Sequence, residues 1–212
     1  MSKRGMIFNG EMVRAILEGR KTQTRRVLAT YQDAVKFCPE WDVNGKQIFI
    51  VLGEKDHTGM NPVITAIPCP FGQPGDRVWV RETFRVHSRA TDVATLVYRA
   101  SVRNSWTEQT HRVPVAVCNK PATPEKWTPS IHMPRWASRI TLEITDVRVE
   151  RLNDIRECDA KAEGGQTECT LIGDKYYPGF RSLWKSIYGE ESWAANPWVW
   201  VIEFKRVEGA AL

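Results

Sequence analysis

The sequence has no long apolar run, no repeat and no low-complexity segment, and each absence excludes a class of protein. A membrane-spanning helix needs about 18 consecutive apolar residues, and no stretch of the chain comes near that length. The basic start, residues 1–5, is not followed by the apolar core of a signal peptide. Of the 212 residues, 42% are hydrophobic and 26% are charged, as in an ordinary globular protein. We therefore expect a cytoplasmic globular protein without a membrane partner.

Cysteine and histidine are present, but their spacing suggests neither a metal site nor a disulfide framework. The five cysteines lie far apart, and an odd number without close pairs argues against structural disulfides. Neither a CxxC nor an HxxxH pattern occurs, so a zinc site would need ligands from distant segments. We expect buried free thiols, no metal and no other cofactor.

The formal net charge is +5, and the chain contains nine tryptophans. A moderate positive charge is compatible with a nucleic-acid partner without establishing one. Most of the tryptophans should belong to the core, whereas a few can serve as platforms on which bases stack. Charge and aromatic content together keep nucleic acids among the candidate ligands.

The most informative stretch is Gly19–Arg25 with Arg26, in which four of eight residues are cationic and two carry hydroxyls. Upstream, the apolar spacing predicts an amphipathic helix over residues 11–18. Asn9 is suited to cap its beginning and Gly19 to end it. A buried helix would thus hold a basic loop in one place, where it suits an anionic ligand. The alternative is a solvated run of charge.

Residues 76–84 alternate between apolar and polar with the period of a strand. Val78, Val80 and Phe84 share one face, and Glu82 falls on that same apolar face. A carboxylate there must be neutral, paired with a cation, or at the open end of a cavity. The alternative is a bulge or early strand end that turns Glu82 to solvent. If it is buried, Glu82 is a candidate functional acid.

The rest of the pattern predicts a mixed α+β fold in a single domain over residues 1–212. We expect a mostly antiparallel, barrel-like sheet and two long excursions. The excursions lie at about 31–69 and 86–134, with 86–95 irregular and 101–134 a polar surface segment. The expected strands are 48–52, 63–67, 96–100, 140–149 and 198–204, and the expected helices are 154–163, capped by Asn153, and 178–188.

At this point the residues resemble a known family. Gly19–Arg25 with Arg26 fits the GxKxxTxR signature of ASCH domains, which are related to PUA and EVE domains. Residues 74–76 with 80–84 resemble the second block of the family. Three further segments, 136–144, 159–164 and 196–200, are similar to phage and prophage members. The match covers nearly the whole chain in the expected order.

The resemblance implies a small PUA-like β-barrel with helices at its rim and a cleft for RNA or a modified nucleobase. Family members include amidohydrolases that remove the acetyl group from acetylcytidine, and a proposed ribonuclease. In the amidohydrolase pattern a lysine, a threonine and a glutamate carry the chemistry, which the motif matches place on Lys21, Thr24 and Glu82. The two excursions have no counterpart in the small hydrolases, which are about half as long.

Hydrolysis of an amide would use Thr24 as the nucleophile and Lys21 as its base. Lys21 shares a face with Thr24 if the loop keeps a helical turn. Lysine acts as a base only when neutral, and burial and the neighbouring arginines would lower its pKa. Glu82 opposes this if it pairs with Lys21; a protonated Glu82 could instead donate to the leaving group.

Two other functions are compatible with the same residues. In a binding module, the arginines would hold phosphates and the tryptophans would stack on bases, while Glu82 accepts from a cytosine amino group. In a ribonuclease, Lys21 would stabilise the phosphorane and Glu82 would act as acid or base. In either case we expect a monomer whose partner is RNA or a modified nucleoside. The candidate ligand-binding residues are Arg20, Arg25, Arg26, Trp79, Arg81, Arg135, Trp136 and Arg139.

Overall fold

A computed structural model describes residues 4–171 and 173–207, and the chain divides into two compact units. Unit 1 combines Met1–Gly19, Arg77–Glu143 and Lys205–Leu212, and unit 2 combines residues 20–76 and 144–204. Each unit is therefore built from separate segments of the chain. We describe each unit by itself.

The first sheet of unit 1 contains β1 (Arg4–Ile7), β6 (Arg77–Arg81) and the beginning of β10 (Thr141–Arg151). β1 runs parallel to β6, and β10 runs antiparallel to it. Gly5 lies opposite Trp79, whose ring takes the space in which a side chain would stand at position 5. The alternation predicted for residues 76–84 is confirmed along β6.

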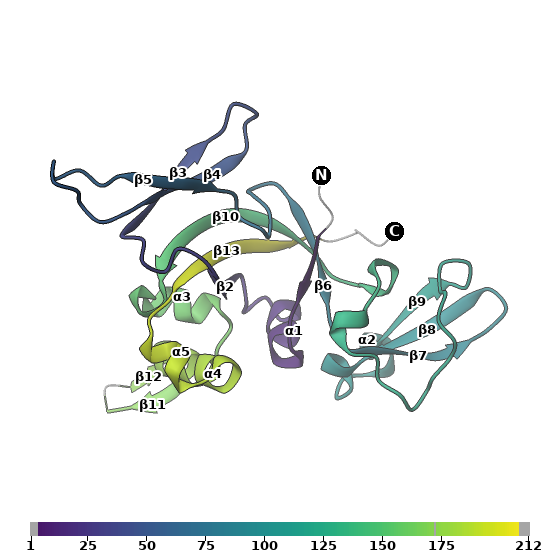
Figure 1. The fold of residues 1–212 in the computed structure, drawn as a ribbon. Helices are drawn as coiled ribbons and strands as arrows, with labels where there is room; N and C mark the ends of the chain where they lie inside the picture. The colour runs from purple at the N-terminus through teal and green to yellow at the C-terminus, as the bar shows by residue number, and fades with distance from the viewer. Residues whose placement is uncertain (1–3, 172, 208–212) are drawn as a thin grey trace. The chain divides into compact units, whose positions relative to one another are not determined.

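The second sheet of unit 1 has the order β7-β8-β9, with all pairs antiparallel (Figure 1). Its strands are β7 (Phe84–Arg89), β8 (Val93–Tyr98) and β9 (Thr110–Pro114). The expectation of an irregular segment over 86–95 is wrong, because a tight hairpin joins β7 to β8 within it. The side chains that these strands bury form one core with residues of the following segment. The core residues are Phe84, Val86, Ala94, Leu96, Tyr98, Val113, Cys118, Met133 and Ala137.

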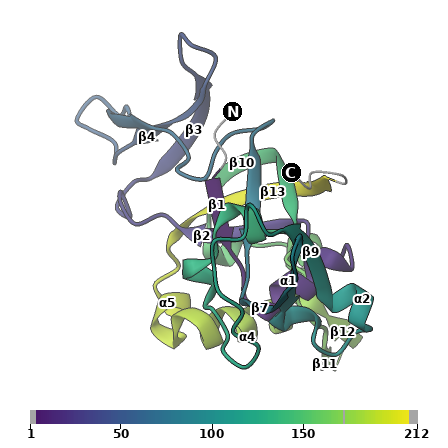
Figure 2. The same cartoon turned by 90° about the vertical axis from the view of Figure 1, so that its right-hand side faces the viewer.

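Unit 1 also contains two helices in the described part of the chain. In α1 (Gly10–Leu17) the Asn9 side chain accepts the Met12 N–H at 2.8 Å, and Gly19 follows with φ of +75°, so the predicted helix and both its caps are confirmed. α2 (Trp106–Gln109) packs beside β9 (Figure 2). The segment 101–134 is thus not only a surface excursion. It contains the short 3₁₀ turn η2 (Ser130–His132). Two further 3₁₀ turns flank it, η1 (Arg99–Ser101) at its start and η3 (Arg135–Ala137) after its end.

The main strands of unit 2 have the order β10-β13-β2. β2 (Gln23–Val27) pairs antiparallel with β13 (Trp198–Val207), whose apolar residues are buried as predicted for a central strand. A three-stranded antiparallel sheet, β3-β4-β5, packs on them through Phe49, which meets Trp200 edge to face at 5.1 Å. Its strands are β3 (Lys36–Trp41), β4 (Gln47–Leu52) and β5 (Val63–Ile67), and the last two confirm the predicted pair.

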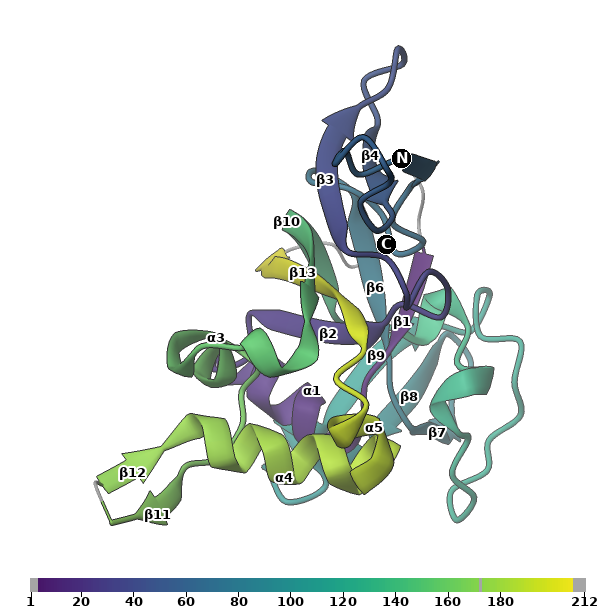
Figure 3. The same ribbon diagram turned by 60° about the vertical axis from the view of Figure 1, so that its left-hand side comes forward.

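Three helices and a small hairpin complete unit 2 (Figure 3). α4 (Tyr176–Tyr188) agrees with the prediction and buries Phe180 and Trp184. α3 (Glu157–Ala162) starts later than predicted, because Asp159 and Arg156 form its cap while the Asn153 N–H binds Asn196. The remaining elements are α5 (Glu190–Ala194), η4 (Leu152–Asp154) and the hairpin of β11 (Glu168–Thr170) with β12 (Gly173–Lys175).

The fold is therefore mixed α+β with mostly antiparallel sheets, as predicted. Within residues 4–171 and 173–207 the strand orders are those of open sheets, so the PUA-like barrel is not confirmed. No helix in this part of the chain is long and apolar enough to cross a membrane. All five cysteines are free, although only Cys69 and Cys118 are buried.

Gly179 in α4 provides a test of the packing in unit 2. A Cβ at this position would lie 1.9 Å from the backbone oxygen of Gln166, which cannot move like a side-chain end. Alanine has a higher helix propensity than glycine, but the clash with the Gln166 backbone outweighs this gain. We therefore expect Gly179→Ala to lower the free energy of unfolding by about 1–3 kcal/mol. Urea denaturation measures this. The matched control is Gly165→Ala, whose Cβ would meet its nearest atom at an ordinary 3.6 Å. Equal stability of the two variants would contradict the close contact between Gly179 and the Gln166 backbone.

Candidate functional site

The basic stretch that dominates the sequence is largely inside unit 2. The side chain of Lys21 is 0% exposed, and its Nζ donates to Glu163 Oε2 at 2.6 Å and to the Glu163 carbonyl at 2.9 Å. Arg25, equally buried, binds Glu163 Oε1 at 3.3 Å and Glu150 Oε2 at 3.3 Å. Two of the four cations are thus neutralised by the protein itself.

A larger network of charged groups surrounds these ion pairs. Gln23 accepts from Arg25 Nη1 at 2.5 Å and donates to Glu203 at 3.0 Å. Arg148 links the same carboxylates, binding Glu203 at 2.5 Å and Glu150 at 2.6 Å. Removing one member would leave a buried charge uncompensated, so the network fixes the geometry of β2 against β10, β13 and α3.

Thr24 points away from this network. Residues 23–27 are extended in β2, and Lys21 makes a bridge with Glu163, so the helical turn that would align Lys21 with Thr24 is not present. Side chains alternate along a strand, and both neighbours of Thr24, Gln23 and Arg25, join the network. Thr24 therefore lies on the opposite face of β2 from the groups that hold Lys21.

Burial lowers the pKa of Lys21, as predicted for a lysine base. Loss of hydration is the main cause; the ion pair with Glu163 opposes it, and Arg26 and Arg25 add to it. The opposing carboxylate is Glu163 and not Glu82, the partner that the sequence analysis considered, because Glu82 pairs with Arg139. Of the other two cations in the stretch, Arg20 is exposed and donates to the Gly164 carbonyl at 2.9 Å, and Arg26 is half-buried.

Net charge is distributed unequally between the units. Unit 1 contains 16 Lys and Arg against 8 Asp and Glu, which gives a formal charge of +8. Unit 2 contains 14 against 17, which gives −3. An anionic ligand is therefore attracted to unit 1 rather than to the unit that holds the basic stretch.

Glu82 in unit 1 is buried and paired with a cation. It is 1% exposed, and its oxygens accept from Arg139 Nε at 2.9 Å and Arg139 Nη2 at 3.1 Å, a bidentate pair. Arg139 is in turn held by Ser101 Oγ at 2.8 Å and by the Tyr98 ring, 4.0 Å below its guanidinium carbon. The predicted position of Glu82 on the apolar face is confirmed, and the bulge that would expose it is wrong.

Burial raises the pKa of Glu82 above its ordinary value, and the Arg139 guanidinium opposes this rise. Each carboxylate oxygen has two lone-pair sites, of which Arg139 uses one. The group therefore keeps capacity to accept further hydrogen bonds from a ligand. Tyr98, which donates to the Ala137 carbonyl at 2.7 Å, fixes the other side of the pair.

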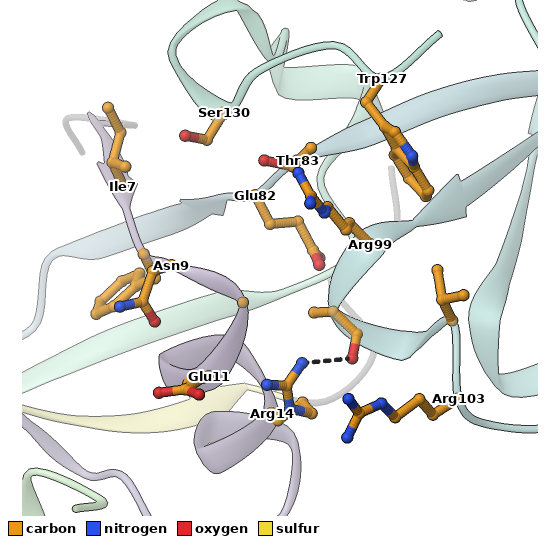
Figure 4. Close-up of a pocket in the computed structure, with 14 residues that line it drawn as sticks. Ile7, Asn9, Glu11, Arg14, Glu82, Thr83, Arg99, Arg103, Trp127 and Ser130 are labelled. Atoms are coloured by element: carbon orange, nitrogen blue, oxygen red, sulfur yellow. Dashed lines mark hydrogen bonds between the residues drawn. The ribbon is translucent and has the colours of Figure 1, made fainter. Parts of the chain in front are cut away.

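Glu82 lines a cavity of about 770 Å³ that lies entirely in unit 1 (Figure 4). Three arginines from different elements also line it: Arg14 of α1, Arg99 of η1 and Arg103 beyond it. Arg14 is oriented by a hydrogen bond to the Ala100 carbonyl at 3.3 Å. The wall also includes the beginning of α1, whose positive dipole end favours negative charge and which carries Glu11 in its first turn. The cavity thus combines the buried carboxylate of Glu82 and the exposed carboxylate of Glu11 with three arginines. Its other lining residues include Ile7, Asn9, Thr83, Trp127 and Ser130.

The other predicted ligand residues of unit 1 have structural contacts. Arg81 and Arg135 lie over the Trp79 ring at 5.5 and 6.0 Å, and Arg81 also donates to the carbonyls of Ser130 and Ile131. Trp136 packs edge to face on the core residue Phe84 at 6.3 Å. These side chains support the first sheet and the core.

Four cavity residues were missed by the sequence analysis: Arg14, Arg99, Arg103 and Trp127. Arg14 is one of two charged residues on the amphipathic helix α1, and Arg99 and Arg103 follow β8 in the sequence. Neither context is specific to a ligand site. In residues 4–171 and 173–207 no group of three His, Cys, Asp or Glu side chains is arranged to hold a metal ion.

The Glu82–Arg139 pair generates a prediction about pH. In Arg139→Met, burial acts on Glu82 without opposition, and its folded-state pKa rises further above the unfolded value of about 4.3. A raised acid pKa means that stability is fully present below the unfolded pKa and is lost as pH rises. We expect the variant to lose about 3–5 kcal/mol at pH 8 and less at pH 5, measured by urea denaturation.

The double variant Glu82→Gln/Arg139→Met serves as control, since it has no carboxylate left to titrate at this position. Its loss of stability relative to Glu82→Gln should be the same at both pH values, since neither variant has a carboxylate to titrate at this position. A pH dependence that persists in the double variant would assign the effect to another group.

Comparison of the chain with protein-family models, with curated proteins and with solved structures gave no match. The ASCH resemblance therefore remains a prediction carried by the sequence motifs.

Proposed function

We propose that this protein binds a nucleotide of a nucleic-acid strand in the cavity around Glu82. The observation that carries the proposal is the combination, in one cavity of about 770 Å³, of a buried carboxylate with three arginines. A nucleotide has the complementary parts: an amino group on its base and a phosphate on its sugar. The volume is that of an ordinary small-ligand site.

Glu82 would accept a hydrogen bond from the exocyclic amino group of the base, as carboxylates do from cytosine N4. Its pair with Arg139 keeps the oxygens in place before the ligand arrives, so little ordering is needed on binding. Arg14, Arg99 and Arg103 would hold the phosphate, a contact that gives affinity without sequence preference. Trp127 offers an aromatic surface to the base.

The charge distribution supports the choice of unit 1, and the sequence resemblance supports the class of ligand. The formal charge of +8 on unit 1 favours a polyanion, whereas Lys21 and Arg25, two of the four cations of the 20–26 stretch, are engaged with carboxylates of unit 2. The resemblance to ASCH domains, which are associated with RNA and modified bases, also points to a nucleic-acid ligand. RNA is the strand that this resemblance favours.

Arg103→Ala should weaken binding of cytidine 5′-monophosphate about tenfold, since it removes a charged contact worth about 1.4 kcal/mol. Isothermal titration calorimetry at low salt measures the affinity, and the loss should shrink as salt is added. Arg77→Ala is the matched control, because Arg77 is an exposed arginine of unit 1 that does not line the cavity. Equal losses in the two variants would mean that only overall charge matters.

Hydrolysis of a modified base is the second candidate, and the lowered pKa of the buried Lys21 favours it. Against it, Lys21 is engaged with Glu163, and Thr24 lies on the other face of β2. Incubation with N4-acetylcytidine, followed by chromatography for cytidine, decides between the two. The binding proposal predicts no conversion. Conversion that disappears in Thr24→Val would establish the hydrolase instead.

A further inference from the structure

Beside the cavity, the β7–β9 sheet presents a face of cations and aromatic rings. Phe84 and Val86 point into the core, so Arg85 between them points to the opposite face, which we call the outer face. On β9, Arg112 stands opposite Thr95, and both lie on this outer face because the neighbouring Val113 and Ala94 face the core. The outer face thus carries arginines at both of its edges.

Aromatic rings lie among these cations. Arg85 lies over the Trp127 ring at 4.7 Å, and His87 meets the Trp106 ring at 5.0 Å. Trp106 is 50% exposed. Arginine and tryptophan in alternation form the kind of surface on which unpaired bases stack while phosphates find a cation.

Trp127 connects the outer face to the cavity, because the same residue lines the cavity and contacts Arg85. Its position is fixed by the backbone: the Thr128 N–H donates to the Phe84 carbonyl at 2.7 Å, and the Phe84 N–H donates back at 3.2 Å. The Thr123 N–H donates to the Val86 carbonyl at 2.8 Å, so residues 123–128 run along the edge of β7. The ring therefore stands at a defined place between the two surfaces.

The charge of this part of the chain suits a polyanion. Residues 84–130 contain seven Lys and Arg against three Asp and Glu. Three strands spaced about 4.8 Å apart make a face about 10 Å wide. Val97 in the middle of this face is 1% exposed, so the accessible part lies toward Arg112 and Trp106, which are exposed.

We propose that the ligand is a single-stranded nucleic acid several nucleotides long, which runs from the cavity across the outer face of β7–β9. This inference rests on the proposed function and extends it. One base enters the cavity at Glu82, the next stacks near Trp127, and the strand continues to Trp106. Arg85 and Arg112 bind its phosphates. Duplexes are excluded from this mode because their bases are already stacked and paired.

The test compares cytidine 5′-monophosphate with cytidine oligonucleotides of three and six residues, as RNA and as DNA, and with a six-base-pair duplex. We expect the six-residue strand to bind at least tenfold more tightly than the mononucleotide and more tightly than the duplex. Trp106→Ala should weaken the six-residue strand about fivefold or more and leave the mononucleotide unchanged. Arg112→Ala should likewise weaken the six-residue strand and not the mononucleotide. It should also reduce the slope of log K against log salt concentration by the amount that corresponds to about one phosphate contact.

Trp41→Ala is the control for loss of an exposed tryptophan, since Trp41 is 62% exposed and belongs to unit 2. Circular dichroism checks that each variant is folded. If Trp106→Ala does not fold, Arg112→Ala still tests the inference. If mononucleotide and six-residue strand bind equally, the inference is wrong while the proposed function stands. If neither binds, both are wrong. Tight strand binding that is insensitive to Trp106 and Arg112 would also overturn the inference.

Discussion

A charge that is removed from water needs an opposite charge beside it, and this constraint decides which cations of the chain are available to a ligand. Lys21 and Arg25 meet it by sharing the carboxylate of Glu163 inside unit 2. Glu82 meets it through Arg139 in unit 1. Two of the four cations in the stretch with the densest positive charge are therefore structural, and we assign ligand binding to the cations of unit 1.

The two buried pairs differ in what surrounds them. The carboxylate of Glu163 is enclosed by its cations, which use both of its oxygens. Glu82 is equally buried but borders a cavity, and arginines from α1 and η1 line the same space. A preorganised acceptor beside cations can recognise a polar anion, whereas an enclosed pair stabilises the fold. This contrast is the reason for proposing a ligand site at Glu82 and not at Glu163.

Local sequence patterns predicted much of this fold, but they could not predict contacts between residues that are far apart in the chain. The spacing that buries Glu82 and the caps of α1 were readable because each depends on a few neighbouring residues. The partner of Lys21 lies 142 positions away, and no local signal pairs the two. The cavity could not be predicted for the same reason, because Arg14 and Arg99 belong to segments that only the tertiary structure brings together. The β7–β8 hairpin was missed because polar residues around its turn resemble a loop.

The central claim is that the ligand contacts unit 1 and not the 20–26 stretch. Photo-crosslinking to a short single-stranded RNA that contains 4-thiouridine, followed by peptide mass spectrometry, tests it most directly. The account predicts adducts in peptides that contain Trp106 or Trp127 and none in the peptide of β2. Adducts concentrated on residues 20–26 would contradict it, since they would show that the buried ion pairs open to receive the ligand.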